Sequence, residues 1–150
     1  MNLIKKLFNR PFKCYLDIIY LRILKFFYKF DSWHTVSSYS CRKYKKQLIE
    51  IINNIENENI VTVEIGCGLG DIISRVDSEN RFGFDFDNRV INASRILHKN
   101  TTFLCGSFED VLLLNTKIDL LILVNWIHNI SMKELENSIE LINSTSSIQY

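Results

Sequence analysis

The stretch Val61 to Asp71, VTVEIGCGLGD, decides the fold. It is a short β-branched, apolar run that reaches an acidic residue, Glu64, and breaks into three glycines with the spacing G-x-G-x-G. Doubly wound α/β folds build a nucleotide pocket from a strand that feeds a glycine turn, because the bare backbone lets a ligand approach the end of the strand. The stretch therefore predicts the first strand of such a sheet and a pocket beside it.

A second acidic residue supports the pocket. The apolar run 81–86 follows about twenty residues later and contains Asp85. A carboxylate at the tip of the second strand can accept hydrogen bonds from both ribose hydroxyls of an adenosine. Glycines alone are also compatible with an ordinary tight turn, but glycines paired with an acid at this distance favour nucleotide binding.

At these residues the chain resembles the class I S-adenosylmethionine-dependent methyltransferases, whose first motif reads acid-x-G-x-G-x-G. A dinucleotide-binding fingerprint would read G-x-G-x-x-G and run into a helix, whereas here the third glycine comes one residue early and Asp71 follows it. The resemblance implies S-adenosyl-L-methionine as the cofactor. In this part of the chain it implies contacts with the cofactor from Glu64, Gly66, Cys67, Gly68, Gly70, Asp85 and Phe86.

The pattern beyond the glycines predicts an α/β, doubly wound parallel sheet. Strands are expected at 60–65, 81–85, 101–105 and 118–124, with a short helix after the glycine turn to about Val76 and helices at about 88–99 and 132–142. Right-handed crossovers then give the strand order 3-2-1-4, with the cofactor across the carboxyl ends. The nearly continuous apolar run 118–124 is typical of a central strand buried on both faces. Asp87 and the pair Ser131 and Glu134 are expected to cap helices, and His98 to be solvated.

The turns after strands three and four carry the remaining site residues that the resemblance implies. In the family, an acidic residue after strand three usually binds the adenine amino group, and here Ser107 stands at that position. Ser107 could accept one hydrogen bond from the amino group, and Phe108 could stack on the adenine ring. Glu109 or Asp110 could take the place of the missing acid. After strand four, Asn125 would face the sulfonium methyl, and Trp126 and His128 the acceptor. His128 is the natural general base, because its reference pKa is about 6.5; the alternative is a histidine that caps or packs near the helix start.

Composition indicates one globular protein with two electrically different parts. The 150 residues are 47% hydrophobic, with one proline and five glycines. Residues 1–50 contain eleven Lys and Arg against three Asp and Glu, net +8, and residues 51–150 contain seven against fourteen, net −7. The four cysteines form no C-x-x-C pair and have no histidine at ligand spacing, so reduced thiols, a cytoplasmic location and no metal are expected.

The basic part, residues 1–57, is predicted to be an N-terminal amphipathic helical extension of a Rossmann-like domain at 58–150. A helix from Pro11 to about Phe30 places Leu16, Ile19, Tyr20, Ile23, Phe26, Phe27 and Phe30 on one face, with the cations on the other side. Such a helix suits an anionic membrane surface, and equally a helix packed on the domain or on a partner subunit. Charges within the run argue against secretion and against a membrane span.

Residues 31–40 are predicted to be a loop, and Cys41 to about Asn57 a helix. This segment resembles the lead-in of some bacterial small-molecule and sugar methyltransferases, which closes over the cofactor and shapes the acceptor pocket. The resemblance places His34, Tyr39 and Arg42 near the chemistry. Taken singly, each is better explained as an ordinary loop or surface residue.

Three function classes follow. The resemblance favours a methyltransferase acting on a hydroxyl of a sugar, lipid or other small metabolite; the alternative is an inactive or truncated relative that associates with a membrane or a partner. A nicotinamide-dependent oxidoreductase is disfavoured by the glycine spacing, and a nucleic-acid substrate by the lack of an N-P-P-Y or D-P-P-Y turn. Relatives normally continue for three more strands, so a chain ending at 148–150, at the start of a fifth strand, is expected to be impaired unless a longer reading frame or partner chain completes the sheet.

Overall fold

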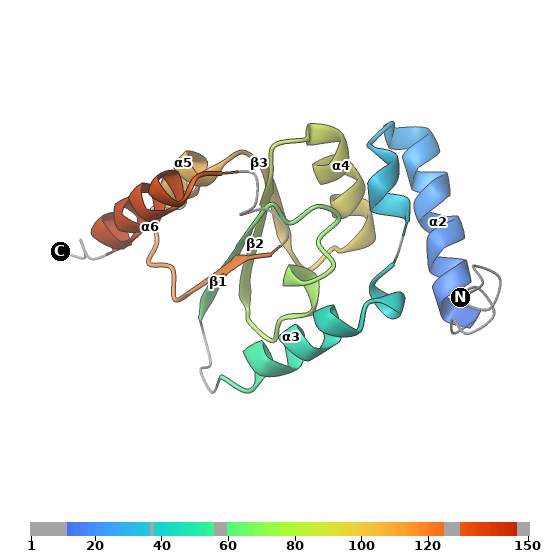
Figure 1. Cartoon of the computed structure of the whole chain (residues 1–150), viewed down its shortest axis with the longest axis horizontal. Helices are drawn as coiled ribbons and strands as arrows, with labels where there is room; N and C mark the ends of the chain where they lie inside the picture. The colour runs from blue at the N-terminus through green and yellow to red at the C-terminus, as the bar shows by residue number, and fades with distance from the viewer. Residues whose placement is uncertain (1–11, 37, 56–59, 125–129, 147–150) are drawn as a thin grey trace.

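The centre of the molecule is a four-stranded, all-parallel sheet in the order β3-β2-β1-β4. The computed structural model describes residues 12–36, 38–55, 60–124 and 130–146 (Figure 1). The strands are β1 (Val61–Ile65), β2 (Asn80–Asp85), β3 (Thr102–Cys105) and β4 (Leu120–Leu123). The predicted fold class and strand order are confirmed. Because all four strands run the same way, their carboxyl ends meet at one edge of the sheet.

Helices cover both faces of this sheet. They are α2 (Phe12–Tyr28), α3 (Lys43–Asn53), α4 (Asn88–Leu97), α5 (Phe108–Val111) and α6 (Met132–Ser146). Short 3-10 turns lie at η1 (Ser32–Thr35), η2 (Tyr39–Cys41), η3 (Ile73–Arg75) and η4 (Leu112–Leu114). In Figure 1 α5 and α6 lie on one side of the sheet, α3 and α4 on the other, and α2 is outermost, beyond α4.

Alternation along β1 produces two cores. Val63 and Ile65 point to the side of α5 and α6, where they pack with Phe84 and Phe108. On the opposite side α3 and α4 contribute Ile49, Ile52 and Ile91 to a second cluster, which also contains Phe103 and Ile122. A third cluster joins α2 to α4 through Leu21, Leu24, Phe30, Leu69, Val90 and Ala93.

Helix starts agree with the predicted caps. The Asp87 side chain accepts a hydrogen bond from the backbone N–H of Arg89 at 2.9 Å. At α6 the Ser131 N–H donates to Glu134 Oε2 at 2.8 Å, and the Glu134 N–H donates to Ser131 Oγ at 3.3 Å. Both capping predictions are confirmed, because a carboxylate or hydroxyl satisfies amides that have no partner within the helix.

Several element predictions were wrong in detail. The expected helix after the glycine turn is only η3, and the expected loop 31–40 contains η1 and most of η2. The helix predicted from Cys41 begins at Lys43. In β4 only Ile122 is buried, because β1 pairs with one edge of β4 and, within the described ranges, no strand pairs with the other. His98 is not solvated: it packs against Phe103, with ring centroids 6.2 Å apart.

The N-terminal helix α2 buries one of its two apolar faces. Its inner face is formed by Cys14, Ile18, Leu21 and Leu24, whereas most of the face predicted as apolar points to solvent. Cys14 and Cys41 form a disulfide with Cα atoms 5.7 Å apart, which ties α2 to η2. The expectation of reduced thiols was therefore wrong for this pair, since cysteines far apart in sequence meet where α2 crosses the lead-in. Cys67 and Cys105 are free.

Some predictions lie outside the described residues. These are the start of the first helix at Pro11, the domain boundary at 57 and 58, the turn residues Asn125, Trp126 and His128, and the start of a fifth strand at 147–150. Each stays a prediction.

Candidate functional site

A cavity of about 560 Å³ lies at the carboxyl ends of β1, β2 and β4. Most of its described walls come from the lead-in before β1, the glycine turn after β1, and the end of β2 with the start of α4, and Val124 after β4 adds to them. The lead-in forms a roof over the turn, since the His34 ring lies 3.3 Å from where a Cβ on Gly68 would stand. Residues lining the cavity include Asp31, Trp33, His34, Arg42, Lys45, Glu64, Gly66, Cys67, Gly68, Leu69, Asp71, Ile72, Asp85, Phe86, Asp87, Arg89 and Val124.

The glycines shape the floor of this cavity. Gly66, Gly68 and Gly70 have φ values of 68°, 55° and 76°, a left-handed conformation that other residues adopt only with strain. Gly66 and Gly68 line the cavity. Gly70 instead serves packing, because a methyl group there would lie 2.5 Å from the Phe103 ring. Two glycines of the motif therefore form the cavity floor, and the third makes room for the Phe103 ring.

Asp85 stands at the end of β2, as predicted, and holds the glycine turn in place. Its Oδ2 accepts from the Gly68 N–H at 2.9 Å, and its Oδ1 accepts from the Asp87 N–H at 3.0 Å. Burial raises the pKa of this carboxyl, and these backbone donors oppose the rise. Each carboxylate oxygen can accept two hydrogen bonds. Backbone donors use only part of this capacity, so Asp85 can still accept from a hydroxyl donor in the cavity.

Glu64 lies at the base of the cavity and is 3% exposed. Its Oε2 accepts from the Ile73 N–H at 2.9 Å. Burial raises the pKa of Glu64 to about 8, because the charged form is poorly solvated there, although the Ile73 bond and Lys45 oppose the rise. At neutral pH Glu64 is therefore mainly protonated, and a cationic group arriving beside it would favour its ionised form.

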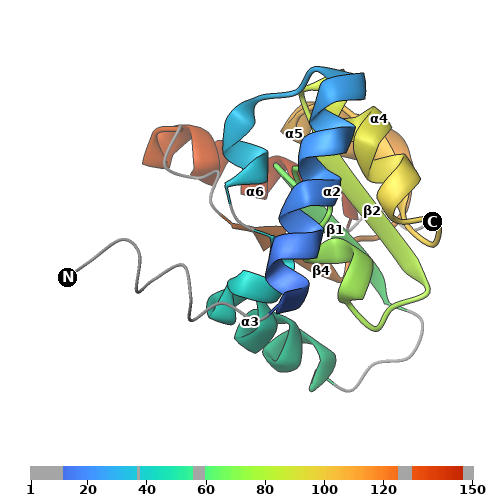
Figure 2. The same cartoon turned by 90° about the vertical axis from the view of Figure 1, so that its right-hand side faces the viewer.

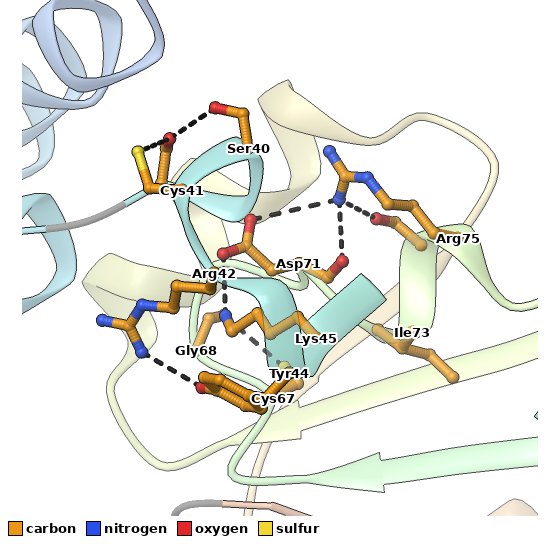
Figure 3. Close-up of polar contacts among 12 residues, drawn as sticks. Ser40, Cys41, Arg42, Tyr44, Lys45, Cys67, Gly68, Asp71, Ile73 and Arg75 are labelled. Atoms are coloured by element: carbon orange, nitrogen blue, oxygen red, sulfur yellow. Dashed lines mark hydrogen bonds and ion pairs between the residues drawn. The ribbon is translucent and has the colours of Figure 1, made fainter. Parts of the chain in front are cut away.

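Two basic side chains of the lead-in, Arg42 and Lys45, line the cavity, and Figure 3 shows their polar contacts together with those of Arg75. Lys45 on α3 donates to Asp71 Oδ2 at 2.8 Å, and Arg75 donates to the Asp71 carbonyl at 2.8 Å. Arg42, just before α3, donates to the Tyr44 hydroxyl at 3.2 Å. The Lys45–Asp71 pair is half-buried and joins the lead-in to the end of the glycine turn. Lys45 and Arg42 thus present cations to the cavity.

The lead-in residues predicted near the chemistry divide into two groups. His34 lines the cavity and stacks on Trp33, with ring centroids 3.6 Å apart. Burial lowers the pKa of His34 to about 4, so its ring is neutral at physiological pH. Tyr39 does not line the cavity; the Arg75 guanidinium lies over its ring, 4.0 Å from the centroid. The structure therefore brings His34 and Arg42 to the site and gives Tyr39 a packing role.

The turn after β3 is also placed away from the cavity lining. Ser107 caps α5 in a box with Asp110, whose Oδ2 accepts from the Ser107 N–H at 2.7 Å. Phe108 is buried in the cluster with Val63 and Phe84. Neither lines the cavity, in contrast to Phe86, which lines it and is 78% exposed. An exposed aromatic ring beside Asp85 is a better stacking surface than the buried Phe108.

Sequence reasoning missed Lys45 as a site residue, although a signal was present. Lys45, Ile49 and Ile52 are spaced i, i+4, i+7, so the lysine lies on the same face of α3 as the two buried isoleucines. A cation on the buried face of a helix needs an anion, and Asp71 directly after the glycines supplies it. Together these residues indicate that α3 is part of the site.

The sheet order, the glycine turn and the cavity at the carboxyl ends define the fold of the class I S-adenosylmethionine-dependent methyltransferases. Solved structures of such enzymes superpose on the chain. Magnesium protoporphyrin IX methyltransferase (ChlM) from Synechocystis PCC 6803, crystallised with bound SAM, matches with a TM-score of 0.55 and 14% identity, over 70% of this chain and 54% of ChlM.

Two further structures give the same result. A TehB-like SAM-dependent methyltransferase from Corynebacterium glutamicum matches with a TM-score of 0.51 and 17% identity, over 61% of this chain and 51% of that protein. DesVI from Streptomyces venezuelae matches with a TM-score of 0.55 and 12% identity, over 67% of this chain and 44% of DesVI. The match thus spans only about half the length of these proteins. No family model and no curated protein matches the sequence.

Proposed function

We propose that the protein binds S-adenosyl-L-methionine in this cavity and transfers its methyl group to a small molecule. The observation that carries the proposal is the joining of the glycine turn to Asp85 at the carboxyl ends of β1 and β2, through the Gly68 N–H. The fold that the chain shares with solved SAM-dependent methyltransferases supports the cofactor class.

The charges in the cavity fit this cofactor, which carries hydroxyls, a carboxylate, an ammonium group and a sulfonium. Among the described residues that line the cavity, the carboxylates outnumber the cations even with the mainly protonated Glu64 left out, and this excess suits a ligand with two cationic groups: Asp31, Asp71, Asp85 and Asp87 against Arg42, Lys45 and Arg89. Asp85 would accept from the ribose hydroxyls, and Phe86 would stack on the adenine. Lys45 and Arg42 would hold the carboxylate, and Glu64 would face the cationic end.

Methyl transfer from a sulfonium is an in-line displacement, in which the acceptor atom forms a bond to the methyl carbon as the carbon–sulfur bond breaks. The protein has to hold the acceptor in line and, for a hydroxyl, remove its proton. We assign the acceptor to the class of small metabolites that carry a hydroxyl, with His128 as the base. His34 and Trp33, which line the roof of the cavity, would then contact the acceptor.

Titration calorimetry with three ligands tests the cofactor. We expect binding of S-adenosylmethionine and of its demethylated product, and no binding of NAD. D85A should weaken binding by about 1 to 3 kcal/mol, because the ribose hydroxyls lose their acceptor. E79A is the matched control, since Glu79 is an exposed acid outside the cavity lining. NAD binding, or an unchanged affinity in D85A, would overturn the assignment.

A further inference from the structure

The helix α2 carries apolar residues on two faces, and only one of them is buried. Its inner face packs against α4 and the lead-in through Cys14, Ile18, Leu21 and Leu24. On its outer face seven apolar side chains are between 47% and 77% exposed. They are Phe12, Leu16, Ile19, Tyr20, Ile23, Phe26 and Phe27, which we name the outer stripe.

The outer stripe is continuous along the whole helix. At about 100° per residue its members fall within an arc of roughly 120°, the width of a face that binds an apolar surface. Figure 2 looks onto α2 and shows it in front of the sheet, as the outermost element on that side. Soluble proteins rarely expose a contiguous apolar surface of this kind unless it binds something. The outer stripe is therefore a candidate binding surface.

Charges at the borders of the stripe identify the kind of occupant. Lys13 and Arg22 are exposed and fall on opposite edges of the stripe on a helical wheel. Lys29 follows the helix, with its Nζ 4.5 Å from the centroid of the Phe26 ring. Asp17 is the acidic residue of α2; it is half-buried and accepts a hydrogen bond from Ser40 Oγ, so it does not neutralise the stripe. The stripe is apolar and aromatic with cations on both sides.

A second copy of the chain fits this pattern poorly. If two outer stripes packed together, the cations at their edges would meet cations, and such like-charge contacts oppose association. Anionic lipid headgroups carry the charge opposite to that of these cations. A bilayer also places its charged headgroup layer directly beside an apolar interior, as α2 places its cations beside the outer stripe. Phe and Tyr rings fit the boundary between these layers, and Lys and Arg meet the headgroups.

We propose that α2 docks on an anionic lipid bilayer, lying in the plane of the interface with the outer stripe inserted between the headgroups and the acyl chains. Insertion in this orientation requires no span, and within the described ranges no helix is long and apolar enough to cross a bilayer. The inner face stays on α4, so docking needs no unfolding of the domain. The cavity residues Asp31, Trp33 and His34 follow α2 directly in the chain, and docking holds that side of the cavity close to the membrane.

Cosedimentation of the full chain with lipid vesicles tests the proposal. Vesicles of phosphatidylcholine containing about a third phosphatidylglycerol should bind the protein at least about tenfold more strongly than phosphatidylcholine alone, and high salt should remove most of the difference. Equal binding to both vesicles, or binding to neither, would overturn the proposal.

Two double variants separate the stripe from general surface effects. I23E/F27E places two carboxylates in the stripe and should reduce binding to anionic vesicles at least about tenfold. L113E/M132E adds the same charge at residues that are 80% and 72% exposed but lie outside α2, and should change binding little. Equal loss in both variants would show that net charge alone acts, against the proposal. K13Q/R22Q, which introduces no acid, should lower the salt dependence.

Sedimentation velocity without lipid tests the alternative that a second copy of the chain binds the outer stripe. A monomer that binds vesicles supports the proposal. Self-association that I23E/F27E abolishes, combined with no vesicle binding, would assign the stripe to a second copy instead. Neither result depends on cofactor binding, so the outcome is separate from that of the proposed function.

Discussion

Glu64 couples the stability of the protein to pH. Its pKa in the folded protein is about 8, against an ordinary value of 4.5. Between these values the folded state keeps a proton that the unfolded state has released, so the folded state loses stability as the pH rises toward 8. E64Q keeps an acceptor for the Ile73 N–H but cannot ionise. We expect E64Q to resemble the parent near pH 5 and to be more stable, by on the order of a few kcal/mol, near pH 9.

Thermal unfolding across this pH range measures the Glu64 effect. E79Q, at an exposed acid, is the control and should follow the parent curve. An E64Q curve parallel to the parent at every pH would show that Glu64 does not titrate in this range.

Lys45 is the second residue whose role can be isolated. K45M keeps most of the side-chain volume but removes the cation that faces Asp71 and the cavity. We expect the affinity for S-adenosylmethionine to fall roughly tenfold, because a charge-assisted bond to the cofactor carboxylate is lost. K43M, at an exposed position of α3, should bind normally in the same calorimetric titration. An unaffected K45M would assign Lys45 to holding the lead-in alone.

At the scale of elements, the glycine turn depends on β3 as well as on β1 and β2. G70A combines a φ of 76° with a methyl group 2.5 Å from the Phe103 ring, so we expect a loss of about 2 to 4 kcal/mol in unfolding free energy. F103L alone should cost less, and G70A/F103L should recover part of the loss, because only the clash is relieved. Urea unfolding of the three variants measures this coupling. Strictly additive losses would mean that Gly70 and Phe103 do not interact.

At the scale of the whole molecule, the disulfide Cys14–Cys41 fixes α2 to the lead-in across a sequence separation of 27 residues. Closing a loop of this length stabilises the folded state by roughly 3 to 4 kcal/mol in the loop-entropy account. C14S/C41S should therefore unfold at lower urea concentration, whereas C105S, which removes a free exposed thiol, should not. Thiol titration in denaturant provides the direct check: two reactive thiols without reductant and four with it. Four without reductant would contradict the bond.

The sequence predicted the sheet better than its surroundings. Strands and glycine turns have short local sequence patterns, and on that basis Glu64, Gly68 and Asp85 were expected at the carboxyl ends of the first two strands, where they line the cavity. The disulfide depends on how the lead-in folds against α2, which no local pattern contains. For the ion pair Lys45–Asp71, the position of Lys45 on the buried face of α3 was the available signal. The sequence left open what the apolar face of α2 meets, because both faces of the helix carry apolar residues and periodicity alone cannot tell which one packs against α4.

The burial of the inner face of α2 against α4 also has a consequence for synthesis on the ribosome. Translation proceeds from the N-terminus, so α2 leaves the ribosome before β1, β2 and α4 exist. Until α4 emerges, the inner face of α2 lacks its packing partner, so both apolar faces of the helix are exposed. We expect the nascent chain to pass through a stage in which chaperones or a lipid surface compete with the unfinished domain for α2.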